Sequence, residues 1–108
     1  MTDRLAMREP TFHVLAALLD GPLHGYGIIK HAHELSEGRV RLAAGTLYVA
    51  LDRLRDAGLV EVDREEVVEG RARRSYRLTG AGREALRAEA ERMAAAARLV
   101  LGRSGARP

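Results

Sequence analysis

The sequence predicts a mainly α-helical chain that carries one small β-hairpin. Apolar residues recur at helical spacing in four segments, and a valine-rich stretch without that spacing separates the third segment from the fourth. The 108 residues suffice for a single domain, and the lack of cysteine excludes disulfides, thiolate zinc sites and cysteine nucleophiles. The core must therefore form by packing of Leu, Val and Ala, and a chain this short would gain from a partner subunit.

The first two helices are predicted over residues 10–20 and 24–35. Pro10 suits a first helical position because its ring presets the backbone angle. The apolar residues at helical spacing are Phe12, Val14, Leu15, Ala16, Leu18 and Leu19 in the first helix, and Ile28, Ala32 and Leu35 in the second. Gly25 and Gly27 cost about 1 kcal/mol each relative to alanine inside a helix, and a close approach of another backbone would explain them.

The third helix is predicted over residues 44–57. Its apolar stripe consists of Leu47, Ala50, Leu51 and Leu54. Gly58 follows the last helical residue and suits the left-handed position at which many helices end. We expect the stripe to face the core and the other side of the helix to face solvent or a partner.

Residues 59–78 predict a β-hairpin with its tip near residues 69–72. The two halves differ sharply in charge. Residues 59–69 hold five acids and one arginine, a net charge of −4, whereas residues 70–78 hold four arginines and no acid, a net charge of +4. The tip and the second strand are therefore expected to present positive charge.

The last helix is predicted over residues 80–101, with Thr79 as its N-cap and a disordered tail over 102–108. Alternating spacings of four and three, typical of helices that pack in pairs, relate Leu86, Ala90, Met93, Ala97 and Val100. These five residues are the predicted dimerisation seam. In the alternative, the helix folds back on the core of its own subunit.

Three helices followed by a two-stranded wing make a winged helix-turn-helix, which we assign to residues 1–79. In this arrangement the third helix enters the major groove of double-stranded DNA. Its side opposite the leucines carries Thr46, Val49 and Arg53, with Tyr48 on the flank. Arg53 could reach a guanine edge or a phosphate, and the Val49 methyl groups a thymine methyl. An ordinary solvated polar face is the alternative.

Arginines outside the third helix are the other candidate DNA contacts. On the wing they are Arg71, Arg73 and Arg74, which would meet a phosphate backbone or a minor groove. The alternative is that they pair with the acids of the first strand. Arg39 and Arg41 form a second basic patch before the third helix. The whole chain has 18 basic residues, of which only Lys30 is a lysine, against 15 acids, for a net charge of +3.

Other function classes find little support in the sequence. The serines stand in no nucleophile motif and no glycine-rich phosphate loop is present, so we predict neither an enzyme nor a bound cofactor. We predict no metal site because the spacing of His24, His31 and His33 does not suit joint ligation by one helix. No membrane span or signal peptide is visible, and a cytoplasmic location is expected. A protein-binding winged helix, or a metal-responsive regulator using those histidines and His13, are the alternatives.

Three motifs together resemble the PadR-like family of transcriptional regulators. They are LDGPLHGYG at residues 19–27, GTLYVALDRL at 45–54 continued by AGLV at 57–60, and RSYRLTGAG at 74–82. The resemblance spans about residues 10–101. The family usually has proline after the tyrosine of the second motif, where this chain has Val49.

The resemblance implies a homodimeric winged-helix repressor of the compact subgroup with a single C-terminal helix. It implies DNA contacts from Thr46, Tyr48, the helix that follows them and the wing, and dimerisation through the C-terminal helix with the N-terminal helix beside it. It also implies release by a small aromatic or phenolic effector. Some members bind such molecules with a tryptophan, a residue that this chain lacks.

Overall fold

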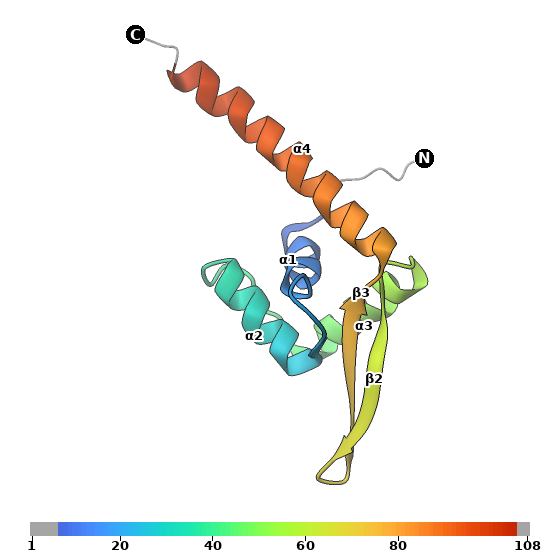
Figure 1. Ribbon diagram of the computed structural model, residues 1–108. Helices are drawn as coiled ribbons and strands as arrows, with labels where there is room; N and C mark the ends of the chain where they lie inside the picture. Colours follow the sequence, from blue (N-terminus) through green and yellow to red (C-terminus); the bar gives the residue numbers. More distant parts are fainter. Residues whose placement is uncertain (1–6, 106–108) are drawn as a thin grey trace.

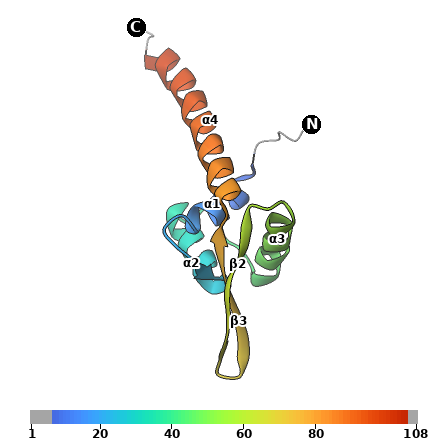
Figure 2. The ribbon, with the colours of Figure 1, turned by 45° about the vertical axis from the view of Figure 1, so that its right-hand side comes forward.

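The computed structural model describes residues 7–105 and confirms the predicted fold class (Figure 1). Within that range the elements are α1 (Glu9–Ala17), β1 (Leu23–His24), α2 (Gly25–Leu35), α3 (Ala44–Asp56), β2 (Val60–Val68), β3 (Arg71–Leu78) and α4 (Gly80–Gly105). The molecule is elongated, with extents of 64 × 31 × 22 Å. The wing formed by β2 and β3 projects from one end and α4 from the other, as both ribbon views show (Figures 1 and 2).

The core lies where the first three helices meet the base of the wing and the start of α4. Its buried residues are Val14, Leu15, Ala17, Leu18, Ile28, Leu47, Leu51, Leu54, Val60, Tyr76, Leu78 and Leu86. The predicted leucine stripe of α3 is confirmed, since all three of its leucines are buried. Leu19 and Leu35, which were named among the apolar residues at helical spacing, lie outside the core and are 44% and 46% exposed. Leu19 lies beyond the end of α1, so helical spacing no longer fixes the direction of its side chain. Leu35 shares the face of the buried Ile28, but it is the last residue of α2, one turn beyond the last buried apolar residue of that helix, Ala32.

The wing is part of a three-stranded antiparallel sheet with the order β1–β3–β2. Val60 pairs with Leu78, and Val62 with Tyr76, which places apolar side chains at the base of the wing. The tip is a two-residue turn, shorter than predicted, in which Glu69 and Gly70 both have positive φ angles (52° and 77°). Strand β1 was not predicted because two residues carry no periodicity. Only its pairing with β3 defines it.

Helix α4 begins at the predicted cap and then departs from the prediction twice. The Thr79 hydroxyl accepts a hydrogen bond from the Gly82 amide at 2.9 Å, as an N-cap does. Leu86, predicted in the dimer seam, is only 4% exposed and belongs to the core of its own subunit. The helix also continues to Gly105, so residues 102–105 are not the predicted disordered tail, and residues 106–108 lie outside the described part. One glycine at position 102 costs about 1 kcal/mol, too little to end a long helix.

None of the helices within residues 7–105 combines the length and the apolar character that crossing a membrane requires.

Candidate nucleic-acid interface

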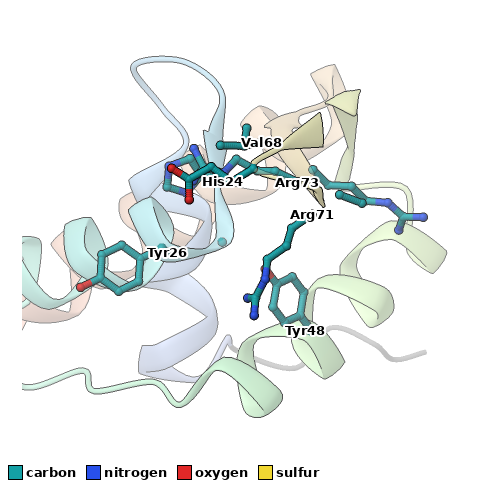
Figure 3. Close-up of a pocket in the computed structure, with 10 residues that line it drawn as sticks. His24, Tyr26, Tyr48, Val68, Arg71 and Arg73 are labelled. Atoms are coloured by element: carbon teal, nitrogen blue, oxygen red, sulfur yellow. The ribbon is translucent and has the colours of Figure 1, made fainter. Parts of the chain in front are cut away.

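A cleft of about 600 Å³ lies between the wing and the first turns of α2 and α3 (Figure 3). It is lined by His24, Gly25, Tyr26, Tyr48, Val68, Glu69, Arg71, Ala72, Arg73 and Arg74. Four of these residues, Tyr48 and the three wing arginines, were predicted DNA contacts. Three segments that are far apart in the chain therefore meet at one surface, which carries several cations and tyrosine hydroxyls.

The ring of Tyr48 packs directly against Gly25. A Cβ atom at position 25 would lie 2.9 Å from the ring carbon that carries the hydroxyl, and closer still to the hydroxyl oxygen. The predicted close approach at Gly25 is therefore real, but a side chain makes it and not another backbone. Gly27 has only ordinary contacts, the nearest being Leu23 Cδ2 at 3.4 Å. Glycine at position 25 thus lets Tyr48 lie beside the start of α2, with 45% of the tyrosine exposed.

The exposed side of α3 carries Thr46, Val49 and Arg53, as predicted. Their spacing of three and four residues places them on one face of the helix, and all three are exposed. Val49 is 54% exposed although it is apolar. None of the three lines the cleft, so α3 offers a surface of its own beside it.

The structure divides the wing arginines into two kinds. Arg74 forms an ion pair with Glu65, which raises the pKa of Arg74, and Arg77 pairs with Glu61 at 2.8 Å and with Asp63 at 3.1 Å. Cross-strand pairing, the alternative interpretation, therefore accounts for these two arginines. Arg71 and Arg73 form no ion pair within the described residues, although Arg73 lies opposite Glu66 in the strand register. They are the two cations nearest the tip.

Neither member of the second basic patch lines the cleft. The Arg39 guanidinium donates two hydrogen bonds to the Glu9 carboxylate of α1, at 2.8 and 3.0 Å. This contact lowers the pKa of Glu9 and holds Arg39 against α1. Arg41 is exposed, and its Nε donates a long hydrogen bond of 3.4 Å to the Gly38 carbonyl. The structure therefore does not gather the predicted DNA contacts into one cluster.

Three of the histidines have local hydrogen-bond partners. His24 Nδ1 accepts from the Gly27 amide at 3.2 Å and so caps α2, His13 Nδ1 lies 2.9 Å from the Glu9 carbonyl, and His31 Nδ1 lies 3.4 Å from the Glu34 carboxylate. In the part of the chain that the structure describes, no three His, Cys, Asp or Glu side chains gather as metal ligands would.

Sequence reasoning missed the contribution of the start of α2. His24, Gly25 and Tyr26 line the cleft, and Tyr26 is 74% exposed. The signal that could have found them is the pair of glycines in the first helical turn, where alanine would be better for helix stability. Of the two, only Gly25 has a neighbour so close that a larger residue would not fit.

Comparison with known proteins identifies the family. Residues 14–88 match the transcriptional regulator PadR-like family. The transcriptional regulator Rv3488 of Mycobacterium tuberculosis is 43% identical over 100 residues, which cover 93% of this chain and 87% of the relative. A PadR family regulator from Clostridium difficile R20291 has a similar fold, with a TM-score of 0.73 at 22% identity over 88% of this chain and 97% of that one.

A further solved structure is that of Bacillus subtilis PadR in complex with operator DNA. It matches with a TM-score of 0.65 and 25% identity over 74% of this chain, but the match spans only 45% of that chain. The family match covers well over half of the sequence and agrees with the winged fold and the motifs around Tyr48. The chain therefore belongs to the PadR-like family of transcriptional regulators, which are regulators and not enzymes.

Proposed function

We propose that this chain is a sequence-specific DNA-binding repressor that acts in the cytoplasm as a homodimer on a palindromic operator. The observation that carries the proposal is the meeting of Tyr48, Arg71 and Arg73 at one cleft, on the end of the molecule that lies opposite the projecting part of α4. The Bacillus subtilis relative, whose solved structure is a complex with operator DNA, supports DNA binding as the function of this chain.

The two exposed surfaces would have different tasks. The face of α3 with Thr46, Val49 and Arg53 would enter the major groove, where an arginine can bind a guanine edge and a valine can contact a thymine methyl. Arg71 and Arg73 would contact phosphates or a narrow minor groove, which fix register and add affinity for any sequence. Specificity would thus come from α3 and much of the affinity from the wing.

Dimerisation is proposed for the part of α4 that projects beyond the core. Its large apolar side chains are exposed in one subunit, at 43% for Met93, 62% for Val100 and 69% for Leu101. Ala90 and Ala97 from the predicted seam are exposed as well. A second copy would cover these side chains and set two α3 helices roughly 34–36 Å apart, one turn of DNA.

A small aromatic or phenolic effector is proposed to release the DNA. A hollow of about 210 Å³ between α1 and α4 supports this, because Phe12 and Met93 give it apolar walls. It lies beside the proposed dimer surface, so an occupant could alter how the two subunits are placed.

The proposal is tested by fluorescence anisotropy with a duplex from the promoter of the gene itself and a scrambled duplex. We expect at least about 10³-fold tighter binding to the operator, a steep loss of affinity with salt, and release by phenolic acids. Equal affinity for the two duplexes at every salt concentration would contradict sequence-specific binding.

The division of tasks between α3 and the wing predicts different losses in two arginine variants. Arg53→Ala is expected to weaken operator binding by about 1–3 kcal/mol and to leave binding to random DNA nearly unchanged. Arg73→Ala should weaken both duplexes by the same factor, because phosphates are common to all sequences. Anisotropy on both duplexes measures each variant, and equal losses on operator and random DNA for both variants would refute the distinction.

Gly25→Ala is expected to impair DNA binding without unfolding the protein. The new methyl group would push the half-exposed Tyr48 ring out of its place, and a lost hydrogen bond to a phosphate would cost about tenfold in affinity. Gly27→Ala, two residues along the same helix, adds the same methyl group without displacing Tyr48. The measurements are operator affinity and Tm for both variants. If both bind operator as tightly as the original chain, Tyr48 does not act from this position.

A further inference from the structure

A second hollow lies on the outer face of α2, beside the loop that leads into α3. We call it the α2 hollow. Its volume is about 450 Å³, and its walls include Tyr26, Ile29, Lys30, Glu34, Arg41 and Leu42. Apart from Arg41, none of these residues was a predicted contact.

Charge in the α2 hollow favours an anion. Lys30 and Arg41 are exposed, and within the described residues neither forms an ion pair. The one carboxylate at the rim, that of Glu34, lies 3.4 Å from His31 Nδ1. Two cations without carboxylate partners therefore stand beside a single acid.

The floor of the α2 hollow is apolar, which suits an anion that also has an apolar part. Ile29 and Leu42 are partly buried side chains that pack against the core. Tyr26, 74% exposed, adds a ring face and a hydroxyl donor at one end. A DNA strand alternates charged phosphates with apolar sugar faces, and such a strand would match both the rim and the floor.

The α2 hollow is continuous with the proposed DNA surface. Tyr26 lines both the α2 hollow and the cleft at the wing, and its ring points away from Tyr48 and Arg71 (Figure 3). Arg41 precedes the first residue of α3 by only three positions. A strand that lies against the start of α3 would therefore pass the start of α2 and reach Lys30.

We propose that the α2 hollow binds the sugar–phosphate backbone of the operator, with Lys30 and the Tyr26 hydroxyl as phosphate contacts. This inference rests on the proposed function, because it extends the same DNA surface across α2. An acidic peptide would match the two cations as well, but continuity with the cleft and α3 favours DNA.

Lys30→Ala tests the inference through the salt dependence of DNA binding. The slope of log affinity against log salt, measured from about 50 to 200 mM on operator and random duplexes, should become shallower by about 0.9 for one lost phosphate contact. Lys30→Arg should keep the slope. Tyr26→Phe removes no charge and should weaken both duplexes by about fivefold at an unchanged slope. Arg83→Ala, an equal charge change at an exposed position in the first turn of α4 and before the proposed dimer surface, is the matched control and should leave the slope unchanged.

The outcomes separate this inference from the proposed function. If the unmodified chain binds neither duplex, the proposed function fails. If it binds and Lys30→Ala leaves slope and affinity unchanged, only the α2 contact is overturned. The same holds if Lys30→Ala loses binding to a fluorescent polyglutamate peptide but not to DNA, since the α2 hollow would then be a protein-binding surface.

Discussion

Replacing Gly82 by alanine is expected to lower the free energy of unfolding by about 3 kcal/mol, the upper part of the usual range for overpacking. A Cβ atom at position 82 would overlap the carbonyl oxygen of Leu59 and lie 2.9 Å from its carbonyl carbon. Both groups are backbone, and they are held in place: the Leu59 amide donates to Leu54, and the Leu59 carbonyl accepts from the Thr79 amide at 3.1 Å. Neither side can retreat without breaking a hydrogen bond where α3, the wing and α4 meet.

Gly80→Ala is the control, because the same methyl group at position 80 has no neighbour within 4 Å. It lies two residues earlier in the same first turn of α4 and should change stability by only a few tenths of a kcal/mol, about the size expected at an exposed site. Urea unfolding followed by circular dichroism measures both variants. Equal stabilities for the two would mean that α4 can shift away from Leu59 at little cost.

Leu86→Ala is expected to cost about 2–5 kcal/mol of subunit stability, the usual range for removing a buried leucine. Leu86 is 4% exposed and belongs to the same cluster as the buried residues of α1 and α3. Val100→Ala removes a smaller side chain that is 62% exposed in one subunit. It should leave the folding of the subunit nearly unchanged. It should weaken the dimer, because the proposed interface would bury Val100 of both subunits.

The two variants are compared by unfolding at several protein concentrations and by sedimentation, since the stability of a dimer depends on concentration. If Leu86→Ala has the same free energy of unfolding as the original chain, the start of α4 is not anchored to the core. A dimer of unchanged affinity in Val100→Ala would remove this residue from the proposed interface.

Element order was predictable because it depends on local periodicity. The leucines at positions 47, 51 and 54 recur at helical spacing, and all three are buried as that spacing requires. The valine-rich run and the second extended run on either side of Gly70 indicated a hairpin, and the observed two-residue turn contains that glycine. Strand β1 could not be predicted, because two residues form a strand only through their pairing with β3.

The candidate site was less predictable, since it depends on contacts between distant segments. Tyr48 and the wing arginines were named as DNA contacts from their residue types and positions. That Arg39 is held by Glu9, 30 positions earlier in the chain, and Arg74 by Glu65 depends on which elements come together. The same holds for Gly25, whose neighbour Tyr48 lies on another helix.

By itself, then, the sequence determined the helices, the wing, the α3 face with Arg53 and the family, since spacing and motifs are properties of neighbouring residues. Only the tertiary structure decided that Leu86 belongs to the core and not to the projecting part of α4. It also decided which arginines form ion pairs with carboxylates of the same chain. The tertiary structure also places the start of α2 at the candidate interface. The physical reason is that burial and ion pairing depend on distances in space, which spacing along the chain does not specify.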